Sequence, residues 1–167
     1  MMYEMINLMD KKYMYKIKEN TKIRVLVLCQ TNSSRSQMAE AFLKTIGKDK
    51  FEVYSAGAKA TSVHPLAIKV MKEIGIDISN QKSKLVQNYK GKTFDYVITL
   101  CTGDPDGACP VFSGNAEVRM YMSFEDPARV KGTDEVVLKA FRKVRDEIKT
   151  TIEDLIDQIL KNEEREQ

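Results

Sequence analysis

Cys29 and Arg35 are separated by five residues, the small or turn-forming sequence Gln-Thr-Asn-Ser-Ser. The apolar run 23–28 before Cys29 predicts a buried strand of a parallel sheet, and the apolar positions after Arg35 recur at helical spacing. The thiol therefore lies at a strand end and the guanidinium at the start of a helix. A cysteine reacts as its thiolate, and a helix N-terminus and a nearby cation both favour that form.

The residues between Cys29 and Arg35 predict an oxyanion-binding loop. Small residues allow successive backbone N–H groups to point toward one anion. Arg35 adds two parallel donors that suit a tetrahedral oxyanion, and Ser36 or Asn32 can bond to the sulfur or hold the loop. Phosphate and arsenate both fit such a site. The expected oxyanion-binding residues are Gln30, Thr31, Asn32, Ser33, Ser34, Arg35 and Ser36.

The rest of the chain alternates between strand and helix patterns. Further strands are predicted over residues 51–57, 94–101 and 118–124, and helices over 38–46, from Pro65 to about 74, and from Thr133 to about 159. This alternation predicts one three-layer α/β domain, a four-stranded open parallel sheet with helices on both faces.

Ligands of such sheets bind beyond the carboxyl ends of the strands. Cys29 ends the first predicted strand, Cys101 ends the third, and Asp126 follows the fourth. We therefore expect these three reactive side chains to converge at one edge of the sheet.

The length, charge and composition of the chain exclude several classes of function. The 167 residues, 43% of them hydrophobic, fit one domain at 23–162, preceded by an extension at 1–22 and followed by a polar tail at 163–167. A net charge of +3 against 31% charged residues argues against nucleic-acid binding. No apolar stretch approaches the roughly 20 residues of a membrane span, and the N-terminus is unlike a secretory signal, so we expect a cytoplasmic protein.

The chain has three cysteines and one histidine. Three cysteines cannot all pair internally, and reducing cytosol disfavours static disulfides, so catalytic or redox roles are expected for them. No Cys-x-x-Cys pair accompanies the single histidine, and we predict no metal site and no cofactor.

Six segments occur in an unbroken order over roughly residues 22–160: CQTNSSRSQMAEAFL, VYSAG, HPLAIKVMKEIGIDIS, VITLC, CP and FEDPA. With these segments the sequence resembles the thioredoxin-coupled arsenate reductases, which share the fold and anion loop of low-molecular-weight protein tyrosine phosphatases.

The resemblance implies reduction of arsenate to arsenite for detoxification, alongside weak phosphatase activity. Cys29 then attacks arsenate, and Asp126 of the Asp-Pro pair protonates the departing oxygen. Cys101 attacks the adduct and releases arsenite, and Cys109 takes over the disulfide and presents it to thioredoxin.

The loop departs from the family pattern Cys-Thr-Gly-Asn-Ser-Cys-Arg-Ser. Gln30, Thr31 and Ser34 replace its Thr, Gly and second Cys. If the family glycine adopts a positive φ, the β-branched Thr31 would be strained or would shift the loop.

Some members of the family bind potassium beside the loop through an Asn, a Glu, a Ser and an Asp. Asn32, Glu40 and Ser55 match, but Lys84 stands in place of the aspartate. An ammonium that pairs with Glu40 would replace the cation, so we predict that potassium is not required.

Two other functions stay open. The same loop and Asp126 could hydrolyse phosphate monoesters through a cysteinyl phosphate, as in a low-molecular-weight protein tyrosine phosphatase, with water in place of Cys101. A third option is an inactive oxyanion-binding module that lost activity through Thr31 and Ser34. Cys101 and Cys109 favour the reductase, because a phosphatase needs neither, and glutathione or mycothiol are alternatives to thioredoxin as donor.

Overall fold

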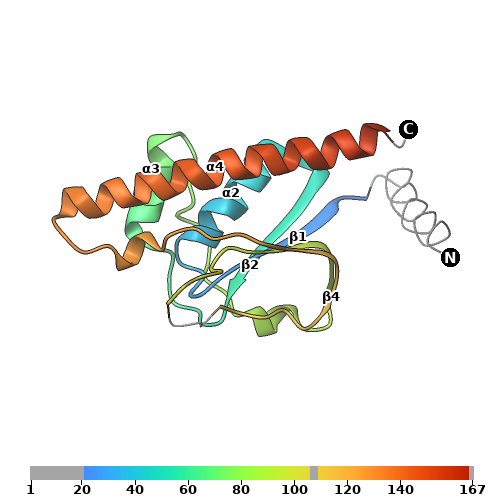
Figure 1. Ribbon diagram of the computed structural model, residues 1–167, viewed down its shortest axis with the longest axis horizontal. Helices are drawn as coiled ribbons and strands as arrows, with labels where there is room; N and C mark the ends of the chain where they lie inside the picture. The colour runs from blue at the N-terminus through green and yellow to red at the C-terminus, as the bar shows by residue number, and fades with distance from the viewer. Residues whose placement is uncertain (1–20, 106–108, 166–167) are drawn as a thin grey trace.

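A four-stranded parallel sheet with strand order β2-β1-β3-β4 forms the centre of the protein (Figure 1). The computed structural model describes residues 21–105 and 109–165, so most of the expected extension at 1–22 lies outside the described residues. The elements are β1 (Ile23–Cys29), α2 (Arg35–Gly47), η1 (Lys48–Lys50), β2 (Phe51–Gly57), α3 (Pro65–Glu73), η2 (Val86–Tyr89), β3 (Thr93–Thr99), β4 (Asn115–Tyr121), η3 (Pro127–Arg129) and α4 (Asp134–Arg165). The predicted parallel sheet is confirmed.

Strand β1 is the central strand and pairs with both β2 and β3. Val25 and Val27 belong to the core on one face of the sheet, and Leu26 and Leu28 to the core on the other. Burial on both faces explains why this strand is a continuous apolar run rather than an alternating one.

The helices α2, α3 and α4 pack on one face, where Phe42 of α2, Val70 of α3 and Phe141 of α4 are fully buried in a single core. The other face is covered by Val86 and Tyr89 of the short 3-10 helix η2, together with Phe112. The prediction of helices on both faces is therefore confirmed, with a 3-10 helix in place of an α-helix on the second face. The connection from β2 to β3 carries α3 on the first face and η2 on the second.

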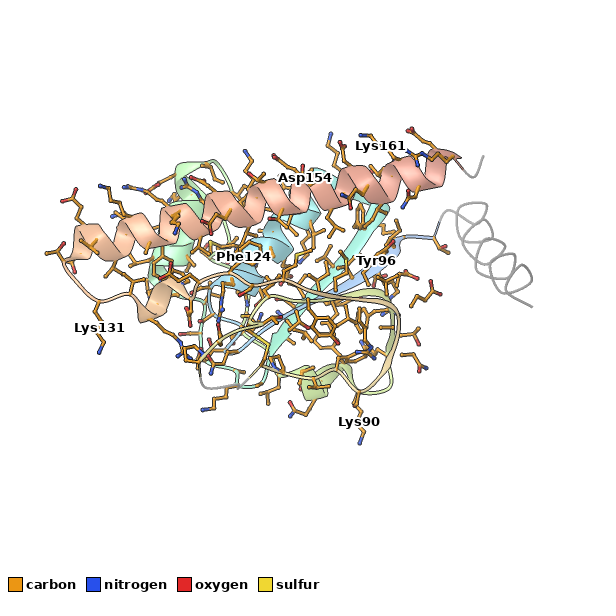
Figure 2. All side chains as sticks on the ribbon, viewed as in Figure 1. Lys90, Tyr96, Phe124, Lys131, Asp154 and Lys161 are labelled. Carbon is orange, nitrogen blue, oxygen red and sulfur yellow. A yellow bond between two sulfur atoms is a disulfide. The ribbon has the colours of Figure 1, made fainter. Side chains whose placement is uncertain are left out.

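Helix α4 runs along the whole length of the helical layer (Figure 1). Its predicted start is confirmed, since Thr133 Oγ1 accepts a hydrogen bond from the Val136 N–H at 3.3 Å. Asp154 and Lys161 lie on its outer face (Figure 2), opposite the buried apolar positions. The helix continues to Arg165, beyond the expected domain boundary at 162.

The two last strands end earlier than predicted. Strand β3 stops at Thr99, and Cys101 forms an isolated antiparallel bridge with Ser123. Strand β4 covers 115–121 instead of 118–124, because it is an edge strand with one partner and tolerates the exposed polar residues at its start. No helix within the described ranges is long and apolar enough to cross a membrane.

Candidate active site

The loop between β1 and α2 surrounds Cys29, whose side chain is buried. Asn32 adopts φ +49, a left-handed conformation that asparagine tolerates better than most residues. Among described non-glycine residues, only Asn32 and Lys48 have a positive φ. Asn32, and not Thr31, therefore adopts the left-handed conformation. The backbone strain expected for a β-branched Thr31 does not arise.

Cys29 Sγ lies 2.8 Å from Ser36 Oγ, and both residues are almost fully buried. Asn32 Nδ2 donates to Ser36 Oγ at 2.7 Å and to Ser55 Oγ at 2.9 Å. Because Ser36 Oγ already accepts from Asn32, its own proton is available to donate to the sulfur. The geometry thus allows Ser36 Oγ to donate a hydrogen bond to the Cys29 sulfur.

The other loop residues are held from outside the loop. Gln30 Oε1 accepts from Arg129 Nη2 at 2.9 Å, and the Ser33 carbonyl accepts from the His64 N–H at 2.9 Å. Ser34 Oγ is buried and has no hydrogen-bond partner among the described residues. His64, just before α3, thus holds the loop backbone, and Arg129, at the end of η3, holds the side chain of Gln30.

Gln37 is a site residue that no sequence motif marks. Its fully buried side chain donates from Nε2 to the carbonyl and side-chain oxygens of Asn32, both at 3.0 Å, and to the Lys82 carbonyl at 2.9 Å. It thereby fixes the left-handed residue of the loop. The signal in the sequence is an amide side chain in the first turn of a predicted helix, because an amide that is buried there needs hydrogen-bond partners.

Arg35 is buried and makes a bidentate ion pair with Asp104, with both N–O distances at 2.8 Å. Nη1 also donates to the Phe124 carbonyl at 3.0 Å, and Nη2 lies 3.5 Å from Asp126 Oδ2. Burial by itself lowers the pKa of Arg35, but the hydrogen bonds to Asp104 and the charges of Cys29 and Asp126 raise it overall. The guanidinium therefore stays charged at the end of the loop.

Asp126 faces this guanidinium from the start of η3. Its Oδ1 accepts from the Ala128 N–H at 3.0 Å, and its Oδ2 lies 3.5 Å from both Arg35 Nη2 and Arg129 Nε. Asp104, Asp126 and Arg129 line a cavity of about 320 Å³. The Asp126 carboxyl thus caps a turn, lines this cavity and lies beside Arg35.

The three cysteines gather at the carboxyl edge of the sheet. The Leu100 N–H donates to the Leu28 carbonyl at 2.8 Å, so Cys29 at the end of β1 and Cys101 just beyond the end of β3 lie on neighbouring segments. Cys101 is buried and forms a disulfide with Cys109, with a Cα–Cα distance of 5.7 Å. This edge therefore holds one free thiol beside one disulfide.

Glu40 lies behind the loop and is surrounded by donors. Ser55 Oγ donates to it, Lys44 Nζ lies at 2.5 Å, and Lys84 Nζ lies at 3.8 Å. Burial lowers the pKa of Lys84, and the charge of Glu40 partly opposes that change. Lysine ammonium groups thus supply the positive charge beside Glu40, as the sequence predicts for Lys84.

Comparison with known proteins identifies the family. The model of the low molecular weight phosphotyrosine protein phosphatases matches residues 24–165. An arsenate reductase of Halalkalibacterium halodurans is 48% identical over 124 residues, which are 74% of this chain and 88% of that protein.

Solved structures agree with this match. A structure of an arsenate reductase in the phosphate binding state has a TM-score of 0.67 at 38% identity and covers 82% of this chain and 98% of that one. A thioredoxin-dependent arsenate reductase from Corynebacterium glutamicum has a TM-score of 0.57 at 29% identity, covering 84% and 63%. The chain belongs to the low-molecular-weight phosphotyrosine protein phosphatase family and, within it, to the arsenate reductases.

Proposed function

We propose that this protein reduces arsenate to arsenite by a thiol–disulfide relay through Cys29, Cys101 and Cys109. The observation that carries the proposal is the disulfide between Cys101 and Cys109, at the same edge of the sheet as the buried thiol of Cys29. A phosphatase needs the oxyanion loop but needs neither of the other two sulfurs.

The first step is attack of the Cys29 thiolate on arsenic. Arg35 and the loop hold the oxyanion, and Ser36 stabilises the thiolate until it reacts. Asp126 protonates the departing oxygen, which leaves as water while a sulfur–arsenic bond forms. Arsenic is still pentavalent in this adduct.

The next two steps move electrons. The Cys101 thiolate attacks Cys29 Sγ, the sulfur–arsenic bond breaks, and its electron pair stays on arsenic, which leaves as trivalent arsenite. Cys109 then attacks Cys101 Sγ and releases the Cys29 thiolate. The product is the Cys101–Cys109 disulfide, the form that this structure contains.

A dithiol must return two electrons and two protons to this disulfide. We infer that thioredoxin is the donor, because the relative from Corynebacterium glutamicum is thioredoxin-dependent. The test is arsenate-dependent NADPH oxidation with thioredoxin and its reductase, compared with glutathione or mycothiol systems. Turnover with either of these and none with thioredoxin would contradict the assignment.

Phosphate-monoester hydrolysis is the second candidate, since Cys29, Arg35 and Asp126 form the nucleophile, anion clamp and acid of such a reaction. Cys101→Ser separates the two functions. We expect this variant to lose arsenate turnover and to hydrolyse p-nitrophenyl phosphate at the wild-type rate, since water replaces the second thiol.

Retained arsenate turnover in Cys101→Ser would contradict the relay. Binding of arsenate without turnover by wild-type protein with any dithiol would instead favour a binding module.

A further inference from the structure

The carboxylate of Asp104 is paired with the guanidinium of Arg35, the group that would bind the oxyanion in the proposed reaction. Its carboxylate accepts from Nη1 and Nη2 of Arg35, each at 2.8 Å, and the side chains of Asp104 and Arg35 are 8% and 2% exposed. Bidentate, charge-assisted pairs that are shielded from water are among the strongest polar contacts in proteins. The pair is therefore a specific contact rather than a loose surface ion pair.

A tight turn connects Asp104 to the disulfide. The Asp104 N–H donates to the Cys101 carbonyl at 3.1 Å, and Gly103 adopts φ +94, the left-handed conformation that this turn requires. Cys101 is itself bonded to Cys109 and bridged to Ser123. The carboxylate therefore lies one tight turn from Cys101, the cysteine whose redox state changes in the proposed relay.

Two carboxylates share the positive charge of Arg35, and Arg129 partly offsets the charge of Asp126. One guanidinium faces the carboxylate of Asp104 directly and that of Asp126 at 3.5 Å, and the Cys29 sulfur lies in the same loop. A bound arsenate or phosphate would place a further one or two negative charges beside them. Like charges this close repel strongly at partly buried sites.

We propose that Asp104 is a redox-linked competitor for the oxyanion site, holding Arg35 in the disulfide form and releasing it in the dithiol form. Reduction by a dithiol breaks the Cys101–Cys109 bond, converts the two sulfurs to thiols with two electrons and two protons, and oxidises the dithiol to its disulfide. The turn that carries Asp104 is then no longer anchored through Cys101 to Cys109. Arg35 becomes available to the oxyanion when the relay can use it.

This competition weakens oxyanion binding by the form of the protein that cannot reduce the ion. The inference rests on the proposed function only in that Cys101 and Cys109 cycle between dithiol and disulfide. Linkage also requires the reverse effect, so a bound oxyanion must favour the dithiol form and raise the reduction potential of the pair.

The test uses inorganic phosphate, which binds without being reduced. Calorimetry should show that the wild-type dithiol form binds phosphate about 10-fold or more tightly than the disulfide form, within the usual range of coupling between sites. In Asp104→Asn we expect the disulfide form to bind phosphate about as tightly as the dithiol form. Saturating phosphate should raise the wild-type reduction potential by about 30 mV for a 10-fold preference, and much less in Asp104→Asn.

Glu125→Gln is the matched control, because Glu125 lines the same cavity, is exposed, and pairs with Lys143 at 3.9 Å. It removes the same charge and should keep the wild-type difference between redox forms. Equal phosphate affinity of the two wild-type forms would overturn the proposal even if Asp104→Asn failed to fold. An unchanged redox difference in folded Asp104→Asn would also overturn it. Neither result depends on arsenate turnover, so failure of the relay would be detected separately.

Discussion

The hydroxyl of Ser36 lies 2.8 Å from the sulfur of Cys29, and the amide of Asn32 donates to the same hydroxyl at 2.7 Å. Asn32 therefore orients the proton of Ser36 toward the nucleophile. The chemistry of the loop depends on this short chain of buried hydrogen bonds as well as on the Cys-x5-Arg spacing.

Replacing Ser36 should slow the first chemical step. We expect Ser36→Ala to lower kcat/KM for arsenate about 10- to 100-fold, because hydrogen bonds to charged groups contribute roughly 1.5–3 kcal/mol. Single-turnover kinetics measures this step directly. Ser34→Ala is the comparison, since the buried Ser34 hydroxyl has no partner among the described residues and its removal should cost much less. Equal losses in the two variants would show that the Ser36 hydroxyl has no special role.

Asp126→Asn should lower kcat by about 10²- to 10⁴-fold, the usual contribution of general acid catalysis. The substitution keeps an oxygen that can accept from the Ala128 N–H, so η3 should remain folded. Glu125→Gln, which removes a neighbouring exposed carboxylate, should keep near wild-type kcat. Similar kcat values for Asp126→Asn and wild type would exclude Asp126 as the acid.

His64, the sole histidine, should make stability depend on pH. Burial lowers the pKa of His64, partly opposed by the charge of Asp126, and His64 Nδ1 accepts from the Leu66 N–H at 3.1 Å only when unprotonated. The unfolded chain therefore binds a proton more readily than the folded one. The free energy of unfolding should fall as pH decreases below about 6.5, the ordinary value for histidine.

His64→Asn keeps an acceptor at the N-cap of α3 and removes the titrating ring. Urea unfolding between pH 7.5 and 5 should show a shallower decrease in this variant than in wild type. The same slope in both proteins would mean that other groups control this pH range.

Potassium should have no specific effect on the protein. Lys84 Nζ lies 3.8 Å from Glu40 Oε2 and donates to the Lys82 carbonyl at 2.6 Å, so an ammonium already occupies the surroundings of this carboxylate. We expect equal melting temperatures and equal kcat in KCl and NaCl of the same ionic strength. A clear rise of either quantity in potassium alone would contradict this expectation.

The sequence predicted the elements that build the site better than the contacts within it. Residues 23–29 form a buried central strand, and Pro65 and Thr133 mark helix starts where their physical chemistry requires them. Strand β4 covers 115–121 and not the predicted 118–124, because an edge strand with one paired neighbour has a weak apolar pattern.

The partners of Arg35 could not be read from the sequence. Asp104 is 69 residues away, and the turn at Gly103 that aims it has no periodic signature. Gln37 and Arg129 likewise act through contacts that depend on packing between distant elements. Spacing predicted that Cys29 and Arg35 lie at the end of a strand and the start of a helix, whereas the hydrogen-bond network around them arises only after the chain folds.

The most direct measurement is disulfide mapping by mass spectrometry, after fully reduced protein reacts with arsenate and free thiols are alkylated. The relay predicts a bond between Cys101 and Cys109 in wild type, and a bond between Cys29 and Cys101 in Cys109→Ser. An arsenate-dependent bond in neither protein, with arsenite nevertheless formed, would contradict the relay.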